Sequence, residues 1–353
     1  MTPPNSWQSS SPQLDLSAMA RAEARQNTLT KPPGSLGQLE QLAITLCGQQ
    51  HTDQPRADRV HMAIFAGDHG VCDEGISAFP QAVTAQMIAN FAGGGAAISV
   101  MARQLGAALE VVNLGTVGDV ADGLPGVIDA RIRPCTRNLA LEPAMTADEV
   151  AAALQAGDAA AERAHQAGAD LFIAGDMGIG NTTSATAIAC QLLGQPPEFL
   201  TGPGTGLNAD GVNHKAAVIV RSLARHGNDT TPLAVLASLG GLEVAAIAGA
   251  ILGAASRGIP VLVDGFIVSV AALVACKQQP ELRHWLHFAH HSAEPGHNAI
   301  LQALNARPLL NLGMRLGEGS GAAVAVPLLR AACALHNQMA SFADAGVSDQ
   351  SAG

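Results

Sequence analysis

One segment of the sequence, GDMGIGNTTSA at 175–185, has residue types that suit a bound phosphate. Its glycines let the backbone approach an anion closely, and its Asn and Thr residues stand at the start of an expected helix. Unpaired N–H groups and the dipole at a helix amino-terminus favour phosphate. A glycine-rich structural turn is the alternative, but the added polar donors favour a phosphate and ribose site. The residues expected there are Asp176, Gly178, Ile179, Gly180, Asn181 and Thr182.

A second glycine-rich segment, TGPGTG at 201–206, precedes an expected helix that contains Lys215. An ammonium group can bind phosphate or ribose oxygens as a point charge, so we assign Lys215 to the same site; a solvated lysine is the alternative. Neither segment has the GxxxxGK[ST] pattern of a P-loop or the later ribose-binding acid of a dinucleotide fingerprint. ATP or NAD chemistry is therefore not expected, and we predict no cofactor.

LGEGSGAA at 316–323 places Glu318 between two glycines, ahead of an apolar helix. This carboxylate could be a first-turn charge that complements the helix dipole, or a general base in a crowded pocket. The residues alone leave both roles open.

Two histidine-containing segments raise the question of a metal. FAGDHGV at 65–71 places Asp68 and His69 at an expected strand end, but no partner set stands at ligand spacing. The HWLHFAHH segment and the residue beyond it offer a spacing that could bind zinc, yet a half-exposed stripe on one helical face is the favoured interpretation. No metal site is predicted anywhere in the sequence. The histidines considered in this second segment and beyond it are His284, His287, His291 and His297.

These segments need a scaffold that brings them together. Alanine-rich helical patterns follow most of the expected strands, and one begins at Thr146 with a capping box that ends at Glu149. This alternation predicts an α/β fold with a Rossmann-like, mostly parallel sheet layered with helices, and a site beyond the carboxyl ends of the strands. The β-branched runs that predict buried parallel strands are 61–68, 109–115, 170–176, 232–238 and 260–265.

The helical patterns near both chain ends lack intervening strands. We expect residues 13–56 and 309–340 to form a small helical domain and residues 57–308 to form the Rossmann-like domain. Residues 1–12 and 344–353 are polar and are expected to be a disordered and a loose tail, respectively.

The composition narrows the class of protein. The 353 residues carry a net charge of -10 without a block of Lys and Arg, which argues against a nucleic-acid surface. Two apolar stretches, 232–255 and 258–276, approach membrane-span length, but Glu243 and Asp264 interrupt them. We expect buried strand-turn-helix segments there and no membrane association. The six cysteines form no CxxC pair and follow no signal peptide, which indicates the cytoplasm.

Several ordered motifs give the sequence a resemblance to a known family. They are KPPGSLG (31–37), FAGDHGV, GISAFPQAVT (75–84), GDMGIGNTTSA, GPGTG, SAEPGH (292–297) and LGMRLGEGSGAA. Together they resemble the nicotinate-nucleotide:dimethylbenzimidazole phosphoribosyltransferases of cobalamin lower-ligand synthesis, over roughly residues 31–335. The resemblance implies transfer of the 5-phosphoribosyl group from nicotinate mononucleotide to 5,6-dimethylbenzimidazole, which gives α-ribazole 5'-phosphate and nicotinate with inversion at the anomeric carbon.

The resemblance also implies roles for individual residues. The family's proton acceptor is the glutamate of the LGEGSGA motif, here Glu318. Gly202 and Gly204 would form the loop on the nicotinate side. Members of the family often carry Glu where this sequence has Asp176, and the shorter side chain would reach the ribose through water. One segment resembles the family's base-binding region and contains Ser77, Phe79 and Gln81. Met87 and Leu316 are expected to form the walls of the base pocket. For Phe79 and Met87, ordinary core packing is the alternative.

The family further implies a Rossmann-like large domain, a small domain made from both chain ends, a homodimer and no metal requirement. Two other functions remain as alternatives. A nucleotide hydrolase would use Glu318 to activate water, and a non-catalytic protein would only bind the nucleotide or the benzimidazole.

Overall fold

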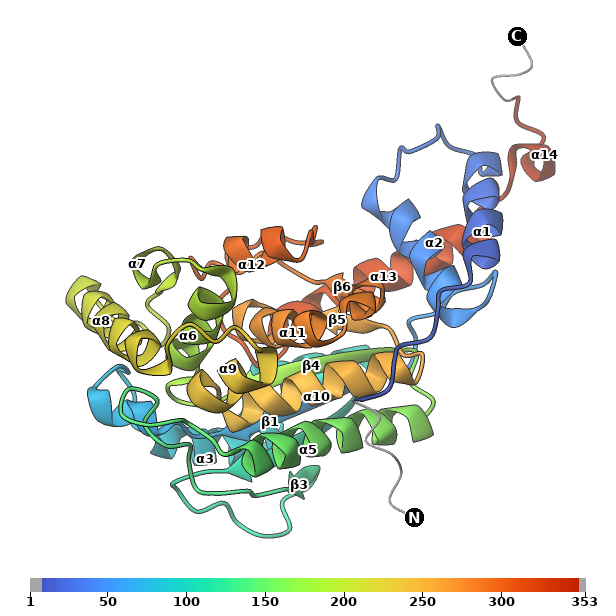
Figure 1. Ribbon diagram of the computed structural model, residues 1–353. Helices are drawn as coiled ribbons and strands as arrows, with labels where there is room; N and C mark the ends of the chain where they lie inside the picture. Colours follow the sequence, from blue (N-terminus) through green and yellow to red (C-terminus); the bar gives the residue numbers. More distant parts are fainter. Residues whose placement is uncertain (1–7, 349–353) are drawn as a thin grey trace.

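The computed structural model describes residues 8–348 (Figure 1). Its strands form one sheet in the order β3-β2-β1-β4-β5-β6, and every neighbouring pair is parallel. This confirms the predicted α/β fold. The strands at 127–129 and 286–288 were not predicted, because each has three residues and, unlike the strand at 261–263, does not lie in a longer β-branched run. The strands are β1 (Val60–Gly67), β2 (Ala108–Gly115), β3 (Val127–Asp129), β4 (Leu171–Met177), β5 (Val261–Val263) and β6 (Leu286–Phe288).

The centre of the sheet explains where a ligand site can form. All eight residues of β1 are buried. Met62 and Ile64 join one apolar cluster, whereas Ala63 and Phe65 join the other, so both faces of the sheet are covered. The chain continues from β1 to β2 on one side and later returns as β4 on the other side. Loops that diverge from such neighbouring strands leave a crevice at the carboxyl ends.

Two of the helices that cover the sheet pack closely against each other, because small residues let their backbones approach. A Cβ on Gly157 of α5 would overlap the Ala246 carbonyl oxygen of α10, and a Cβ on Gly249 would overlap the Leu154 carbonyl oxygen. The helices are α1 (Leu16–Thr28), α2 (Gln38–Gln50), η2 (Gly70–Glu74), α3 (Ala82–Gly93), α4 (Ala97–Leu105), α5 (Ala147–Gln166), α6 (Asn181–Leu193), α7 (Pro197–Leu200), α8 (Ala209–His226), α9 (Pro232–Leu239), α10 (Leu242–Ser256), α11 (Phe266–Gln278), η3 (Pro280–Trp285), α12 (His297–Ala303), α13 (Ser320–Gln338) and α14 (Phe342–Ala345).

The predicted capping box of α5 is present. The Glu149 N–H donates to Thr146 Oγ1 at 3.1 Å, and the Thr146 N–H donates to Glu149 Oε2 at 2.8 Å. The same Glu149 carboxylate accepts bonds from Arg133 and Arg137, which tie the loop after β3 to this helix.

Two secondary-structure predictions were wrong. The run 232–238 is helix α9 rather than a strand, because Pro232 occupies a first-turn position. A short run that is apolar except for Ser238 has no period that separates helix from strand. Residues 232–255 therefore form two helices, whereas 258–276 hold the expected strand, turn and helix. The predicted histidine-bearing helix is also wrong, since His287 lies in β6 and is buried.

Helices α1 and α2 lie together with α14 and the end of α13, away from the sheet (Figure 1). Helix α13 begins beside the sheet and extends to α2, against which it packs (Figure 1). Arg25 and Gln26 of α1 form hydrogen bonds with His336 of α13. Part of each predicted tail is ordered: the Pro12 carbonyl accepts a bond from Trp285 Nε1, and α14 includes Asp344. Residues 1–7 and 349–353 of those tails lie outside the described residues.

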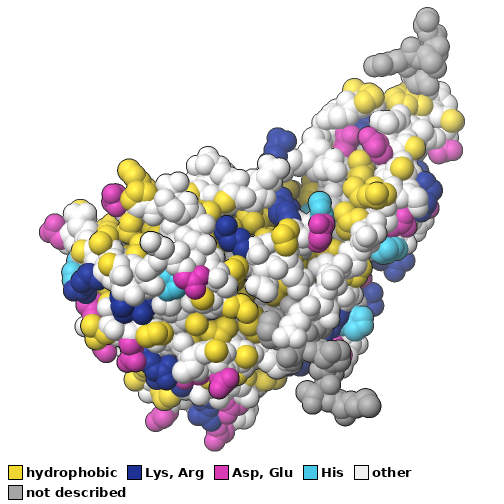
Figure 2. Space-filling view, viewed as in Figure 1, with side chains coloured by type: hydrophobic (Ala, Val, Ile, Leu, Met, Phe, Trp, Pro, Cys, Tyr) yellow, Lys and Arg dark blue, Asp and Glu magenta, His cyan; other side chains and the backbone are white. Residues whose placement is uncertain are grey.

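The stretch Ala82–Leu105 is long and apolar enough, by length and composition alone, to cross a membrane. In the structure it is divided into α3 and α4, which Gly94 and Gly95 separate. On the face shown in Figure 2, Lys and Arg side chains are scattered among Asp and Glu and do not gather into one basic patch.

Candidate active site

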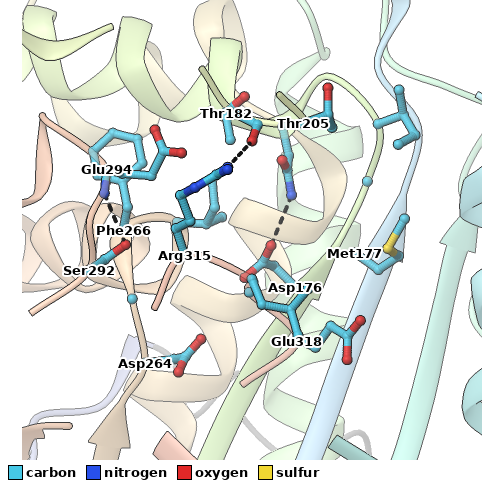
Figure 3. Close-up of a pocket in the computed structure, with 18 of the residues that line it drawn as sticks. Asp176, Met177, Thr182, Thr205, Asp264, Phe266, Ser292, Glu294, Arg315 and Glu318 are labelled. Atoms are coloured by element: carbon cyan, nitrogen blue, oxygen red, sulfur yellow. Dashed lines mark hydrogen bonds between the residues drawn. The ribbon is translucent and has the colours of Figure 1, made fainter. Parts of the chain in front are cut away.

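A pocket of about 370 Å³ lies beyond the carboxyl ends of β4 and β5 (Figure 3). Its walls come from α3, from the turn between β4 and α6, and from the loop before α13. The predicted site residues that line it are Asp176, Gly178, Ile179, Asn181, Thr182, Gly204, Phe79, Met87, Leu316 and Glu318. The predicted residues outside this lining are Gly180, Lys215, Gly202, Ser77 and Gln81.

The turn 177–182, which we call the phosphate loop, brings backbone donors to the pocket. Gly180 has a φ of 97°, and α6 begins at the next residue. A Cβ on Gly178 would overlap the Gly67 carbonyl oxygen, so the loop rests directly on the end of β1. The Ile179 N–H is not free for an anion, because it donates to Thr84 Oγ1 at 3.1 Å. The N–H groups of Asn181 and Thr183 are engaged as well, by the carbonyls of Gly178 and Gly180. The amides of Gly180 and Thr182, at the amino-terminus of α6, are therefore the donors that an anion can use.

Lys215 is a buried cation directly behind this loop. Its side chain on α8 is almost fully buried, and Nζ donates to Thr182 Oγ1 at 2.7 Å and to the Gly202 carbonyl at 3.3 Å. Burial lowers the pKa of Lys215 to about 8, although the nearby Glu294 carboxylate acts in the opposite direction. The structure thus excludes the alternative of a solvated lysine. A bound anion would restore the charge that burial disfavours.

Glu318 has an unusual backbone. Its φ of 65° lies in the left-handed region, as do those of Gly317 and Gly319 on either side. A non-glycine residue in this region is strained, and such strain tends to occur at functional sites. The carboxylate is largely buried, and Oε2 accepts the Ile98 N–H of the first turn of α4 at 3.4 Å. Burial raises the pKa of Glu318, which makes the carboxylate a stronger proton acceptor.

Two more carboxylates, Asp176 and Asp264, line the same pocket as Glu318 (Figure 3). Asp176 accepts a bond from Asn181 Nδ2 at 2.9 Å. Burial, followed by the charges of Asp264 and other carboxylates, raises the pKa of Asp176 well above its ordinary value. Asp264 Oδ1 accepts the Ala322 N–H of α13 at 2.7 Å. Like charges this close disfavour simultaneous ionisation, so this wall can hold a proton.

The side of the pocket next to α3 is apolar and open. Phe79 is 51% exposed and Leu316 is 60% exposed, which is incompatible with core packing of Phe79. Ser77 and Gln81 shape this segment instead of lining the pocket. Ser77 Oγ bonds with Thr205 Oγ1 at 3.2 Å, and Gln81 Nε2 donates to the His69 carbonyl.

A family model described as phosphoribosyltransferase matches residues 11–347. The chain belongs to this family. It is 60% identical over 347 residues to the nicotinate-nucleotide--dimethylbenzimidazole phosphoribosyltransferase of Pseudomonas putida KT2440, with 98% of this chain and 99% of the relative covered. It is 57% identical over 335 residues to the enzyme of that name from Xanthomonas axonopodis pv. citri, with coverages of 95% and 96%. A crystal structure of the Thermus thermophilus enzyme matches with a TM-score of 0.90 and 47% identity, over 95% and 100% of the two chains.

Several residues of this phosphoribosyltransferase line the pocket without having been predicted. Arg315 Nη1 donates to the Gly204 carbonyl at 3.0 Å and so connects the loop before Glu318 with the TGPGTG loop. Glu294 is buried near Lys215, and burial raises its pKa. Arg315 and Glu294 lie inside the family motifs LGMRLGEGSGAA and SAEPGH, which were the available signals.

Asp68, His69 and Glu243 are engaged outside the pocket lining. His69 Nε2 lies 2.7 Å from Glu243 Oε1, and both side chains are fully buried. Asp68 accepts bonds from Thr84 Oγ1 and the Val117 N–H. Within residues 8–348, no group of three or more His, Cys, Asp or Glu side chains could hold a metal ion. Two acids interrupt the apolar stretches of the sequence. Glu243 is the ion-pair partner of His69, and Asp264 lines the pocket.

Proposed function

We propose that this phosphoribosyltransferase transfers the 5-phosphoribosyl group of nicotinate mononucleotide to 5,6-dimethylbenzimidazole, with α-ribazole 5'-phosphate and nicotinate as products. This places it in the nucleotide-loop branch of cobalamin biosynthesis. The names of its relatives support the two substrates. The observation that carries the proposal is the geometry of Glu318, a buried carboxylate in the same pocket as an anion-binding helix amino-terminus.

In this proposal the nucleotide lies over the phosphate loop. The 5'-phosphate takes the amides of Gly180 and Thr182 and the Thr182 hydroxyl, with Lys215 behind it. The phosphate charge favours the protonated form of Lys215, whose pKa is lowered to about 8 without a ligand. The loop that contains Gly202 and Gly204 then borders the nicotinate ring, and Asp176 reaches the ribose through water.

The benzimidazole occupies the apolar side, between Phe79, Met87 and Leu316. A flat ring buried there gains about 2 to 3 kcal/mol from the removal of apolar surface from water. Ser77 and Gln81 hold the segment that carries Phe79 and so shape the slot.

The transfer step needs one base and no acid. The lone pair of one benzimidazole nitrogen forms a bond to ribose C1', while the glycosidic bond breaks and its electron pair goes to the nicotinate nitrogen. That nitrogen leaves as a neutral pyridine, because it was a positively charged pyridinium in the substrate. The proton on the other benzimidazole nitrogen passes to Glu318. Attack from the face opposite the leaving group inverts the anomeric configuration.

A chromatographic assay of the purified protein tests the proposal. Nicotinate mononucleotide is supplied with and without 5,6-dimethylbenzimidazole, and nicotinate and any new nucleotide are followed. Nicotinate release only in the presence of the base is expected. Release without the base would instead indicate a hydrolase, and no release would leave a binding role.

The assembly and location form a separate part of the proposal. We infer a cytoplasmic homodimer in which residues 13–56 and 309–340 act as a small domain beside the Rossmann-like domain 57–308. The packing of α13 against α2 and the hydrogen bonds between α1 and α13 support this division. All six cysteines are free thiols, as a reducing compartment favours. Light scattering after size-exclusion chromatography should give the mass of two chains; the mass of one chain would refute the homodimer.

A further inference from the structure

A threonine in the first turn of α3 contacts both halves of the pocket. Thr84 is fully buried, and its Oγ1 donates to Asp68 Oδ1 at 2.6 Å and accepts the Ile179 N–H at 3.1 Å. Val83 and Met87, on the same helix, line the side proposed for the base, whereas Ile179 belongs to the phosphate loop. One hydroxyl therefore joins the two elements that would hold the two substrates.

Asp68 sets the direction of this hydroxyl. It is fully buried at the end of β1, and its second oxygen, Oδ2, accepts the Val117 N–H at 2.9 Å. Because a carboxylate oxygen accepts, Oδ1 takes the Thr84 proton and leaves the lone pairs of Oγ1 for the Ile179 N–H. A charge-assisted bond in a dry interior is stronger than a neutral one, so the chain from Asp68 through Thr84 to Ile179 is rigid.

We propose that Asp68 and Thr84 position the two substrates relative to each other by fixing the spacing between the phosphate loop and α3. This inference rests on the proposed phosphoribosyl transfer. The attacking nitrogen and ribose C1' must lie about 3 to 3.5 Å apart, and a misplacement of about 1 Å can lower the rate about 100-fold. Thr84 is a positioning residue, since it acts through the Ile179 peptide.

Steady-state kinetics of the full-length Thr84→Val variant test this role, because valine keeps the shape and removes the hydroxyl. We expect kcat to fall about 10- to 100-fold, while the KM of each substrate changes less than about threefold. Thr84→Ser retains the hydroxyl and should retain most of the wild-type kcat. If Thr84→Val does not fold, Thr84→Ala removes the same bonds without adding bulk, and the same fall in kcat is expected.

Thr136→Val is the matched control. Thr136 is also buried, and its Oγ1 accepts the Gly70 N–H at 3.3 Å, but this hydroxyl does not join α3 to the phosphate loop. It should lose stability without the fall in kcat. A Thr84→Val enzyme within twofold of the wild-type kcat, or an equal loss in Thr136→Val, would overturn the positioning role. A wild-type protein that shows no transfer at all would overturn the proposed function first.

Discussion

Replacement of Glu318 by Gln removes the proposed proton acceptor with little change in shape. The side-chain oxygen of glutamine can still accept the Ile98 N–H, and the variant no longer buries a carboxylate whose pKa burial raises. The fold should therefore be retained. General base catalysis contributes about 10²- to 10⁴-fold, or about 3 to 5 kcal/mol of the barrier. We expect Glu318→Gln to lower kcat by this factor.

Initial rates of base-dependent nicotinate release provide the assay. The KM for nicotinate mononucleotide should change little, because the phosphate loop and Lys215 belong to other elements than the loop that carries Glu318. A variant with a kcat within threefold of wild type would refute the role of Glu318 as base. A rise in KM without a fall in kcat would mean that Glu318 only binds substrate.

The pH profile adds a second test of the same residue. Glu318 accepts a proton only in its ionised form, so kcat should fall as the pH decreases through its pKa. Burial raises that pKa above the ordinary value of 4.5, and the acid limb should be displaced upward accordingly. The Glu318→Gln variant should lack this limb. An identical limb in both enzymes would assign it to another group.

Three further variants test the rest of the site. Lys215→Met removes a charge-assisted bond worth about 1.5 to 3 kcal/mol and should raise the KM for nicotinate mononucleotide at least about tenfold in initial-rate assays; an unchanged KM would contradict the phosphate assignment. Gly178→Val places a side chain against the Gly67 carbonyl oxygen and should weaken nucleotide binding in calorimetry, whereas wild-type affinity would refute the loop's role. Asp176→Asn should raise the free energy of unfolding near pH 8, because each unit by which the pKa of Asp176 is raised costs about 1.4 kcal/mol once the group ionises. The gain should disappear well below the ordinary pKa of 3.8, where the carboxyl is protonated in both states. A loss of stability near pH 8 in urea denaturation would contradict the direction of the shift.

Much of the fold could be predicted from the sequence because parallel strands buried on both faces leave continuous apolar runs. Those runs located β1, β2, β4 and β5. The same property misled at 232–238, because a buried helix of eight residues is as uniformly apolar as a buried strand. At β6, histidines suggested a helical stripe, but His287 faces the interior and its Nε2 lies 2.9 Å from Gln49 Oε1.

The pocket was predictable where one short segment supplies several of its residues. The phosphate loop and the segment 316–318, which contains Glu318, are such segments, and both line the pocket. What could not be predicted depends on partners far apart in the chain. The Ile179 amide is occupied by Thr84, 95 residues earlier, and the Arg315 guanidinium reaches Gly204, 111 residues away. Only the folded sheet brings such pairs together.

The most direct test of the proposed transfer is the identity of its products. Nicotinate mononucleotide and 5,6-dimethylbenzimidazole are incubated with the protein, and the products are quantified by chromatography. The configuration of the new nucleotide is determined from the proton NMR signal of its anomeric proton. The proposal predicts one nicotinate for each nucleotide formed, and the α configuration at C1'. Nicotinate accompanied by free ribose 5-phosphate, or a product with the β configuration, would contradict direct inverting transfer.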